Sequence, residues 1–194
     1  GSFRLATAGS VKDKRKDAQE LVLRFLAFLV RDYRKYERTI GINRFLSETM
    51  VILNAYPDFK SKDLQKIVDR EHVNMSDISV DHIQRAEFLF ESGMRRSYNI
   101  FGWHCFRRSY GNRRRSPINK SLFETWGVLL ALLEEEKYHK FLDNRAGLWD
   151  DYVPFLDGSD GYRFRNAISR DSMKATAVRY RFEIIEQLIQ KHSQ

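Results

Sequence analysis

The chain has 194 residues, a net charge of +8 and 14 phenylalanines, so it is no disordered tail and is long enough for one domain with its own core. Only 10 glycines and 3 prolines interrupt its long periodic apolar segments, which predicts an all-α fold: a single helical domain of about six to eight helices around a central apolar helix. The single cysteine, Cys105, cannot form an internal disulfide, and no signal peptide or membrane-spanning segment is recognisable. We therefore expect a cytoplasmic protein without membrane contact.

The first sixteen residues are expected to lie outside the helical domain, which we place at residues 17–194. Gly1-Ser2 is typical of the remnant of a cleaved tag, and the run KDKRK at 12–16 indicates a basic arm or the end of a linker. Because no initiator methionine stands at the start, we expect a missing N-terminal part of a longer protein.

The longest apolar block is ELVLRFLAFLV at residues 20–30. Its apolar residues cover every face of a helix, so this helix should be central. Asp17 is a plausible N-cap that forms a capping box with Glu20, and the helix is expected to run to about Glu37. The embedded Arg24 is expected to pair with Glu20 one turn earlier; the alternative is a buried arginine reserved for a ligand.

Apolar periodicity and capping signals predict the remaining helices. They cover about 43–55, a short helix capped by Ser61, a helix capped by Ser76 or Ser79 that ends near Gly102, a helix from Ser116-Pro117 to about Lys137, a short helix around 148–156, and a final helix capped by Ser169 or Ser172. The run DGSDG at 157–161 indicates a turn, since it lacks the later ligands of a calcium loop.

The positive charge is concentrated in one segment. Between Ser92 and Phe123 there is no Asp or Glu, while eight arginines and lysines fall in this window, so the rest of the chain is neutral on balance. A basic segment of this kind is typical of a site for a polyanion.

Within this segment the stretch WHCFRRSYGNRRR, residues 103–115, mixes arginines with Trp103, Phe106 and Tyr110. Guanidinium groups form paired hydrogen bonds with phosphate oxygens, and aromatic rings stack on unpaired bases. We therefore predict contact with the backbone of a nucleic acid, most simply DNA. The residues predicted to make it are Arg107, Arg108, Arg113, Arg114, Arg115 and Lys120.

Two alternatives stay open for the same arginines. One is a surface that docks an acidic partner protein or the missing N-terminal domain. The other is a solvated loop whose arginines pair with acidic residues elsewhere in the chain, such as Glu134–Glu136 or Asp150-Asp151.

No catalytic or metal-binding constellation is recognisable. His104-Cys105 lacks the further ligands that a zinc site requires, and catalytic Cys–His pairs meet in space, rarely as sequence neighbours. Neither a GxGxxG sequence nor a phosphate loop ending in Lys-Ser/Thr occurs. We expect no metal and no cofactor in this chain, which does not look like a complete enzyme by itself.

A series of short segments resembles, in order and approximate spacing, the C-terminal helical half of the domain-of-unknown-function 262 family, the GmrSD-like group of prokaryotic restriction and phage-defence proteins. The segments are ELVLRFLAF at 20–28, Phe45-Leu46, Ile100-Phe101-Gly102 with Phe106-Arg107, INKSLFE at 118–124, Ala167-Ile168-Ser169 and RFEII at 181–185. By this resemblance Arg24, Asn119 and Arg181 are family-motif positions. As polar groups on apolar helices, we expect them to form hydrogen bonds in the core, or alternatively to face another domain.

Full-length members of that family carry an N-terminal ParB-like domain with a DGQQR-type motif associated with nucleotide hydrolysis, and many carry an HNH-type nuclease domain. Neither motif occurs in this sequence. The resemblance therefore implies a parent protein that is a nucleotide-dependent nuclease, without placing either activity in this chain. The function expected here is a helical module of a DNA-restriction or anti-phage protein, and the alternatives are a scaffold or protein-interaction module and, least favoured, a nuclease in its own right.

Overall fold

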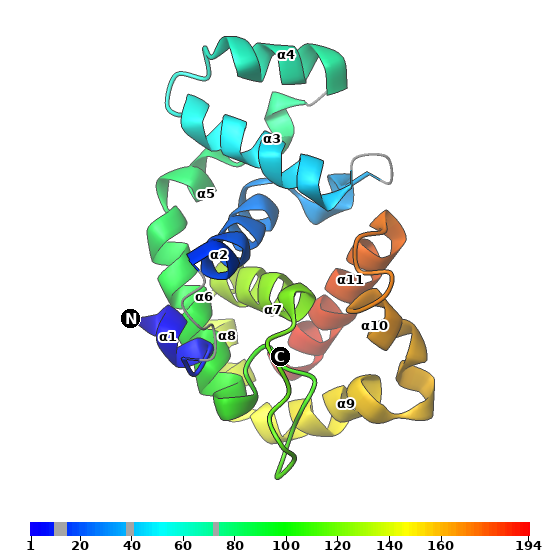
Figure 1. The fold of residues 1–194 in the computed structure, drawn as a ribbon. Helices are drawn as coiled ribbons and strands as arrows, with labels where there is room; N and C mark the ends of the chain where they lie inside the picture. Colours follow the sequence, from blue (N-terminus) through cyan, green and yellow to red (C-terminus); the bar gives the residue numbers. More distant parts are fainter. Residues whose placement is uncertain (10–14, 38–40, 72–73) are drawn as a thin grey trace.

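The computed structural model describes residues 1–9, 15–37, 41–71 and 74–194. Within these ranges it contains eleven α-helices and no β-strand, which confirms the all-α class (Figure 1). The helices are α1 (Ser2–Ala6), α2 (Arg15–Val30), α3 (Ile42–Ala55), α4 (Lys62–Glu71), α5 (Val80–Gln84), α6 (Ala86–Phe101), α7 (Lys120–Leu132), α8 (Glu135–Asp143), α9 (Arg145–Asp157), α10 (Tyr162–Ala167) and α11 (Ala175–His192). The count roughly fits the six to eight expected, because three of the eleven helices have six residues or fewer.

The apolar helix α2 lies at the centre, packed against α7, α3 and α6 (Figure 1). Phe25 and Phe28 are buried, and Phe28 contacts both Phe45 on α3 and Phe182 on α11. The predicted capping box is wrong, because Asp17 lies inside the first turn of α2. The helix also ends at Val30 and not near residue 37.

Helices α6 and α7 make the most extensive contact in the fold. They approach at a glycine pair: a Cβ on Gly93 would lie 2.5 Å from the carbonyl oxygen of Gly127. Phe25 of α2 lies against both glycines. Two helices that pass this closely need small residues at the crossing, so this pair determines how α6 and α7 pack on the central helix.

Several predicted helix ends differ from those observed. Helix α7 starts at Lys120 with Asn119 as its N-cap, and the Ser116-Pro117 signal lies in the loop before it. Helix α11 starts at Ala175, and neither predicted serine caps it. In contrast, the Oγ atoms of Ser61 and Ser79 accept hydrogen bonds from the first turns of α4 and α5, as the sequence predicts.

Residues 1–9 pack against the helical body and do not extend as an arm. Helix α1 lies on α6, Ala6 and Thr7 are buried, and the ring of Phe3 contacts Phe90 and Phe123. Residues 12–14 of the predicted basic run lie outside the described residues. Among the described helices, none is long and apolar enough to cross a bilayer.

Candidate nucleic-acid interface

Residues 103–119, here called the arginine loop, connect α6 to α7 and project from the helical body (Figure 1). Gly102 ends α6 with a φ of +53°, a left-handed conformation that suits glycine at a helix C-terminus. The loop closes on itself, because the backbone N–H of Asn119 donates to the carbonyl of Phe106 at 2.8 Å. The arginines between these two residues are therefore carried on a tethered structure.

A cluster of polar side chains holds the loop in shape. His104 contacts the hydroxyl of Ser109 through Nδ1 at 2.9 Å and donates from Nε2 to the carbonyl of Gly111 at 2.8 Å. The hydroxyl of Ser116 accepts from the backbone N–H groups of Arg108 and Ser109, and the Ser116 N–H donates to Ser109 Oγ in return. These bonds pre-organise the backbone that presents the exposed arginines.

Arg107 is the anchor of the loop and not part of its contact surface. Its side chain is 3% exposed, and its guanidinium donates to the carbonyl of Thr7 at 3.1 Å and to the carbonyl of Ser116. Burial lowers the pKa of this arginine from its ordinary value. The burial of Arg107 on two backbone carbonyls argues against the prediction that it contacts nucleic acid.

The other four loop arginines, Arg108 and Arg113–Arg115, are exposed. Arg113 forms an ion pair with Asp157 at the end of α9 at 2.7 Å and lies over the ring of Tyr110. Arg115 lies over the indole of Trp103, 5.2 Å from its ring centroid. These contacts order two of the four guanidinium groups while leaving them at the surface.

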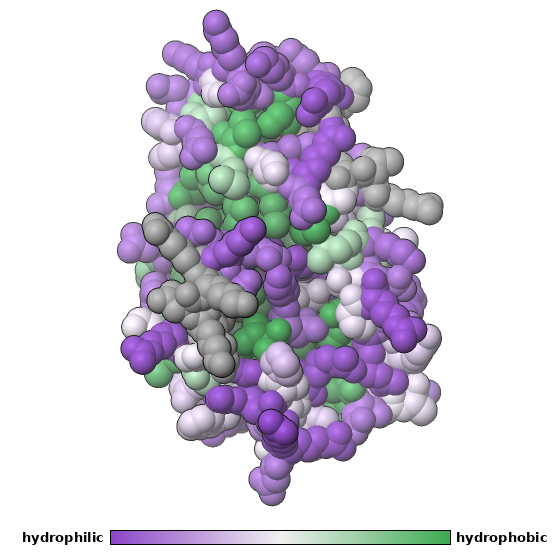
Figure 2. All heavy atoms as spheres, in the orientation of Figure 1, coloured by the Kyte–Doolittle hydropathy of each residue, from purple (hydrophilic) through white to green (hydrophobic). Residues whose placement is uncertain are grey.

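Arg108, Arg113 and Arg114 line an open groove of about 470 Å³ between the loop and the end of α9. Its other wall includes Leu156 and Asp157. Figure 2 shows the lower end of the molecule, where the loop projects, covered by hydrophilic side chains, whereas the largest group of hydrophobic ones on this face lies in the upper half. The groove therefore combines three cations with one carboxylate at a polar end of the molecule.

Of the three loop aromatics, Trp103 alone is well placed to stack on a base. Its side chain is 68% exposed. Phe106 is buried and contacts Phe123 of α7, so its predicted stacking role is wrong. Tyr110 donates its hydroxyl to Asp157 at 2.8 Å, which raises the pKa of the phenol.

Four of the five acidic residues proposed as partners for the loop bind other side chains. Glu135 binds Arg96, and Asp151 binds Lys191 and His192. Lys120, the sixth predicted contact residue, is about half exposed and binds Glu20 at 2.6 Å. Among the contacts within the described ranges, Asp157 is thus the acidic partner that the arginine loop uses.

The family-motif arginines meet in the core. Arg24 Nε donates to Glu124 Oε2 at 2.7 Å, and Arg181 donates to the other oxygen of the same carboxylate. Glu20 lies 3.5 Å from Arg24 and is the longer, half-exposed contact, so the predicted partner is secondary. Burial lowers the pKa of Arg181, and the Glu124 carboxylate opposes this shift. We call Arg24, Glu124 and Arg181 the charged core.

Asn119 has a structural position as well. Its side-chain oxygen accepts from the N–H of Leu122 and caps α7, while its amide donates to the carbonyl of Ile168 at 2.8 Å.

The sequence analysis did not predict the role of Glu124. An acidic residue in the middle of the apolar helix SLFETWGVLL was the available signal, because a buried carboxylate requires a cationic partner.

Cys105 is fully buried, and burial raises the pKa of its thiol well above the ordinary value. Its neighbour His104 uses both ring nitrogens to shape the loop. Across residues 1–9, 15–37, 41–71 and 74–194, no three His, Cys, Asp or Glu side chains lie together as metal ligands would.

The sequence analysis did not predict a second basic segment. The chain outside residues 92–123 has a net charge of zero, but its positive and negative charges are unevenly distributed. Between Tyr162 and Phe182 there are six arginines and lysines and a single acidic residue, Asp171. This segment contains α10 and the start of α11. A sliding count of charge along the whole chain would have found it.

The chain matches no protein-family model, no curated protein and no solved structure at a significant level. The function of the arginine loop is therefore argued from its own residues and from the sequence resemblance described above.

Proposed function

We propose that this chain is a helical module of a prokaryotic DNA-restriction or anti-phage protein and that it contacts the nucleic-acid backbone through Arg108, Arg113, Arg114 and Arg115. The observation that carries the proposal is the arginine loop itself, which presents four exposed guanidinium groups on a backbone tethered by Arg107 and the His104–Ser109–Ser116 bonds. The resemblance to the domain-of-unknown-function 262 family supports the restriction or defence context. The module belongs to a cytoplasmic protein.

Contact with phosphates fits this loop better than reading of base edges. Direct readout needs an element that enters a groove and aims side chains at the bases. The four arginines lie on an irregular loop, and two of them are already ordered by Asp157 and Trp103. Binding to phosphate oxygens requires only charge and forked donors, so affinity should be independent of sequence and steeply dependent on salt.

The test is fluorescence anisotropy with a random-sequence DNA duplex over a series of salt concentrations. Reversing Arg113, Arg114 and Arg115 to glutamate should weaken binding and flatten the dependence of log K on log salt, since each lost phosphate contact removes about 0.9 from the slope. The control reverses the exposed lysines Lys60, Lys62 and Lys66, which changes net charge equally. Equal binding by the wild-type and the loop variant would contradict the proposal.

A second candidate function is docking of an acidic protein, and the Arg113–Asp157 ion pair favours it because the groove already holds a carboxylate. Poly-glutamate is the matching probe in the same anisotropy assay. Displacement of a bound duplex by poly-glutamate at equal charge concentration would favour protein docking. Tighter binding of the duplex would favour the nucleic acid.

A further inference from the structure

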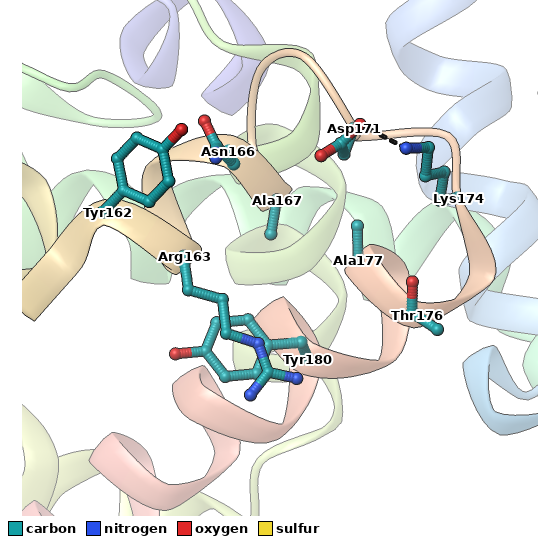
Figure 3. A pocket seen from close by; sticks show the side chains of 9 residues that line it. All are labelled: Tyr162, Arg163, Asn166, Ala167, Asp171, Lys174, Thr176, Ala177 and Tyr180. Atoms are coloured by element: carbon teal, nitrogen blue, oxygen red, sulfur yellow. Dashed lines mark ion pairs between the residues drawn. The ribbon is translucent and has the colours of Figure 1, made fainter.

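A pocket of about 300 Å³ lies between α10 and the start of α11, in the second basic segment (Figure 3). Ala167 and Ala177 line it between the two helices, with Tyr162 on one side and Lys174 on the other. Nothing in the proposed function uses this pocket. Its volume is at the lower end of those that hold small ligands, and an intact duplex would not enter it.

A guanidinium plane forms one wall of the pocket. The guanidinium carbon of Arg163 lies 3.9 Å from the ring centroid of Tyr180, so one face of the cation is covered by the ring and the other is turned away from it (Figure 3). Arginine planes and tyrosine rings are the surfaces on which proteins stack unpaired bases. Tyr162, 64% exposed, supplies a second ring on the side of the pocket away from Lys174 (Figure 3).

Polar groups complete the pocket. The side-chain amide of Asn166 offers a donor and an acceptor, the pair of groups that suits the edge of a base. Lys174 binds Asp171 at 2.7 Å, which offsets the single carboxylate in the lining. The cation of Arg163 therefore leaves the pocket with net positive charge, as a phosphate requires.

The pocket is joined to the arginine loop through one short stretch of chain. Arg113 binds Asp157, the last residue of α9, and the chain then passes through η4 (Ser159–Gly161) into α10. Arg165 of α10 donates to the carbonyl of Gly158 at 2.7 Å, which ties these segments together. A strand held at the loop can thus lie close to the pocket.

We propose that this pocket binds an unpaired nucleotide, with its base between Tyr162 and the Arg163–Tyr180 stack, the base edge at Asn166 and the phosphate at the N–H groups of Arg163. The inference rests on the proposed function in one respect: the nucleotide would belong to a nucleic-acid strand that is bound at the arginine loop. The pocket would therefore recognise the unpaired nucleotides at single-stranded ends and in gaps.

Isothermal titration with deoxyadenosine monophosphate tests the pocket alone. The wild-type chain should bind it, and Tyr162→Ala and Arg163→Gln should each weaken binding at least tenfold. Both residues are exposed, so the variants should fold, and Phe88→Ala, a similarly exposed aromatic residue on α6, is the matched control. No binding by the wild-type chain, or equal binding of inorganic phosphate, would overturn the inference.

Anisotropy with a blunt duplex and with a duplex carrying a five-nucleotide overhang then separates the two proposals. We expect the overhang to raise affinity and Tyr162→Ala to remove only this gain. Duplex binding without nucleotide binding would overturn the pocket alone. Nucleotide binding without duplex binding would overturn the proposed function alone and leave the pocket standing.

Discussion

Arginines have two different roles in this molecule, and two arginines that are adjacent in the sequence can have different ones. In the charged core, Arg24 and Arg181 are 1% and 0% exposed and share both oxygens of Glu124. In the arginine loop, Arg107 is buried on backbone carbonyls while Arg108 beside it is exposed. An arginine that is buried beside a hydrogen-bond acceptor stabilises the fold. An arginine that is exposed on a tethered loop remains available to bind a partner.

The largest expected effect comes from removing the shared carboxylate. Glu124→Gln should destabilise the fold by about 3–5 kcal/mol, because it removes the carboxylate charge that the two buried arginines share. Urea unfolding followed by circular dichroism measures this loss. Glu136→Gln is the control, since Glu136 is exposed and its ion pair with Lys140 contributes at most about 1 kcal/mol.

Replacing the whole charged core separates charge from packing. The triple variant Arg24→Met, Glu124→Leu, Arg181→Met should recover most of the stability that Glu124→Gln loses, because a buried ion group is often replaceable by apolar residues of similar volume. A triple variant no more stable than Glu124→Gln would show that the hydrogen bonds of Arg181 to Ala167 and Ser172 matter more than the charge balance.

The next effect sharpens the contrast within the loop. Arg107→Met should cost about 1–3 kcal/mol of unfolding free energy, since the carbonyls of Thr7 and Ser116 lose their buried donor. Arg108→Met, one residue away and exposed, should change stability by less than about 0.5 kcal/mol. Equal losses in urea unfolding would remove the distinction between the two residues.

The same pair should reverse its order in nucleic-acid binding. Arg108→Met should lower the slope of log K against log salt by about one, the effect of one lost phosphate contact. Arg107→Met should keep the wild-type slope at a temperature where it is fully folded. Anisotropy with a random duplex gives both slopes, and an unchanged slope in Arg108→Met would exclude this residue from the interface.

The smallest effect concerns an ion pair at the surface. Hydrogen bonds from Lys191 and His192 lower the pKa of Asp151 below its ordinary value. A depressed carboxyl pKa stabilises the fold above the unfolded value, about 3.9, and this stabilisation is lost as pH falls through the folded pKa. Asp151→Asn should therefore cost about 0.5 kcal/mol at pH 7 and nothing once the wild-type carboxyl is protonated.

Thermal unfolding across pH 2–7 measures this dependence, and Asp150→Asn is the matched control on the same helix. A constant difference between Asp151→Asn and the wild type across that range would contradict the role assigned to the ion pair.

The sequence predicted the class of fold and much of its core, because periodic apolar residues report burial directly. It placed α3 almost to the residue, and it named Ser61 as a cap and Ser79 as one of two candidate caps. It failed at Ser116, whose hydroxyl caps no helix since it binds the N–H groups of Arg108 and Ser109 across the loop. A hydroxyl that binds backbone N–H groups seven and eight residues earlier in a loop leaves no periodic signal in the sequence.

The candidate site was predicted in the same uneven way. Charge counting found the arginine loop but could not separate Arg107 from Arg108, because the carbonyl of Thr7 that binds Arg107 is 100 residues away in sequence. Periodicity gave Arg24 a local partner in Glu20, whereas the shorter contact is to Glu124, again 100 residues distant. Pairings that depend on helix packing require the fold itself.

Modification of arginines by phenylglyoxal, read by mass spectrometry with and without a DNA duplex, shows which arginines a bound nucleic acid covers. Arg108, Arg113, Arg114 and Arg115 should react in the free protein and be protected by DNA, while Arg24, Arg107 and Arg181 stay unreactive in both states. The exposed Arg85, which lies between α5 and α6, should react equally with and without DNA. Loop arginines that react equally with and without bound DNA would contradict the account.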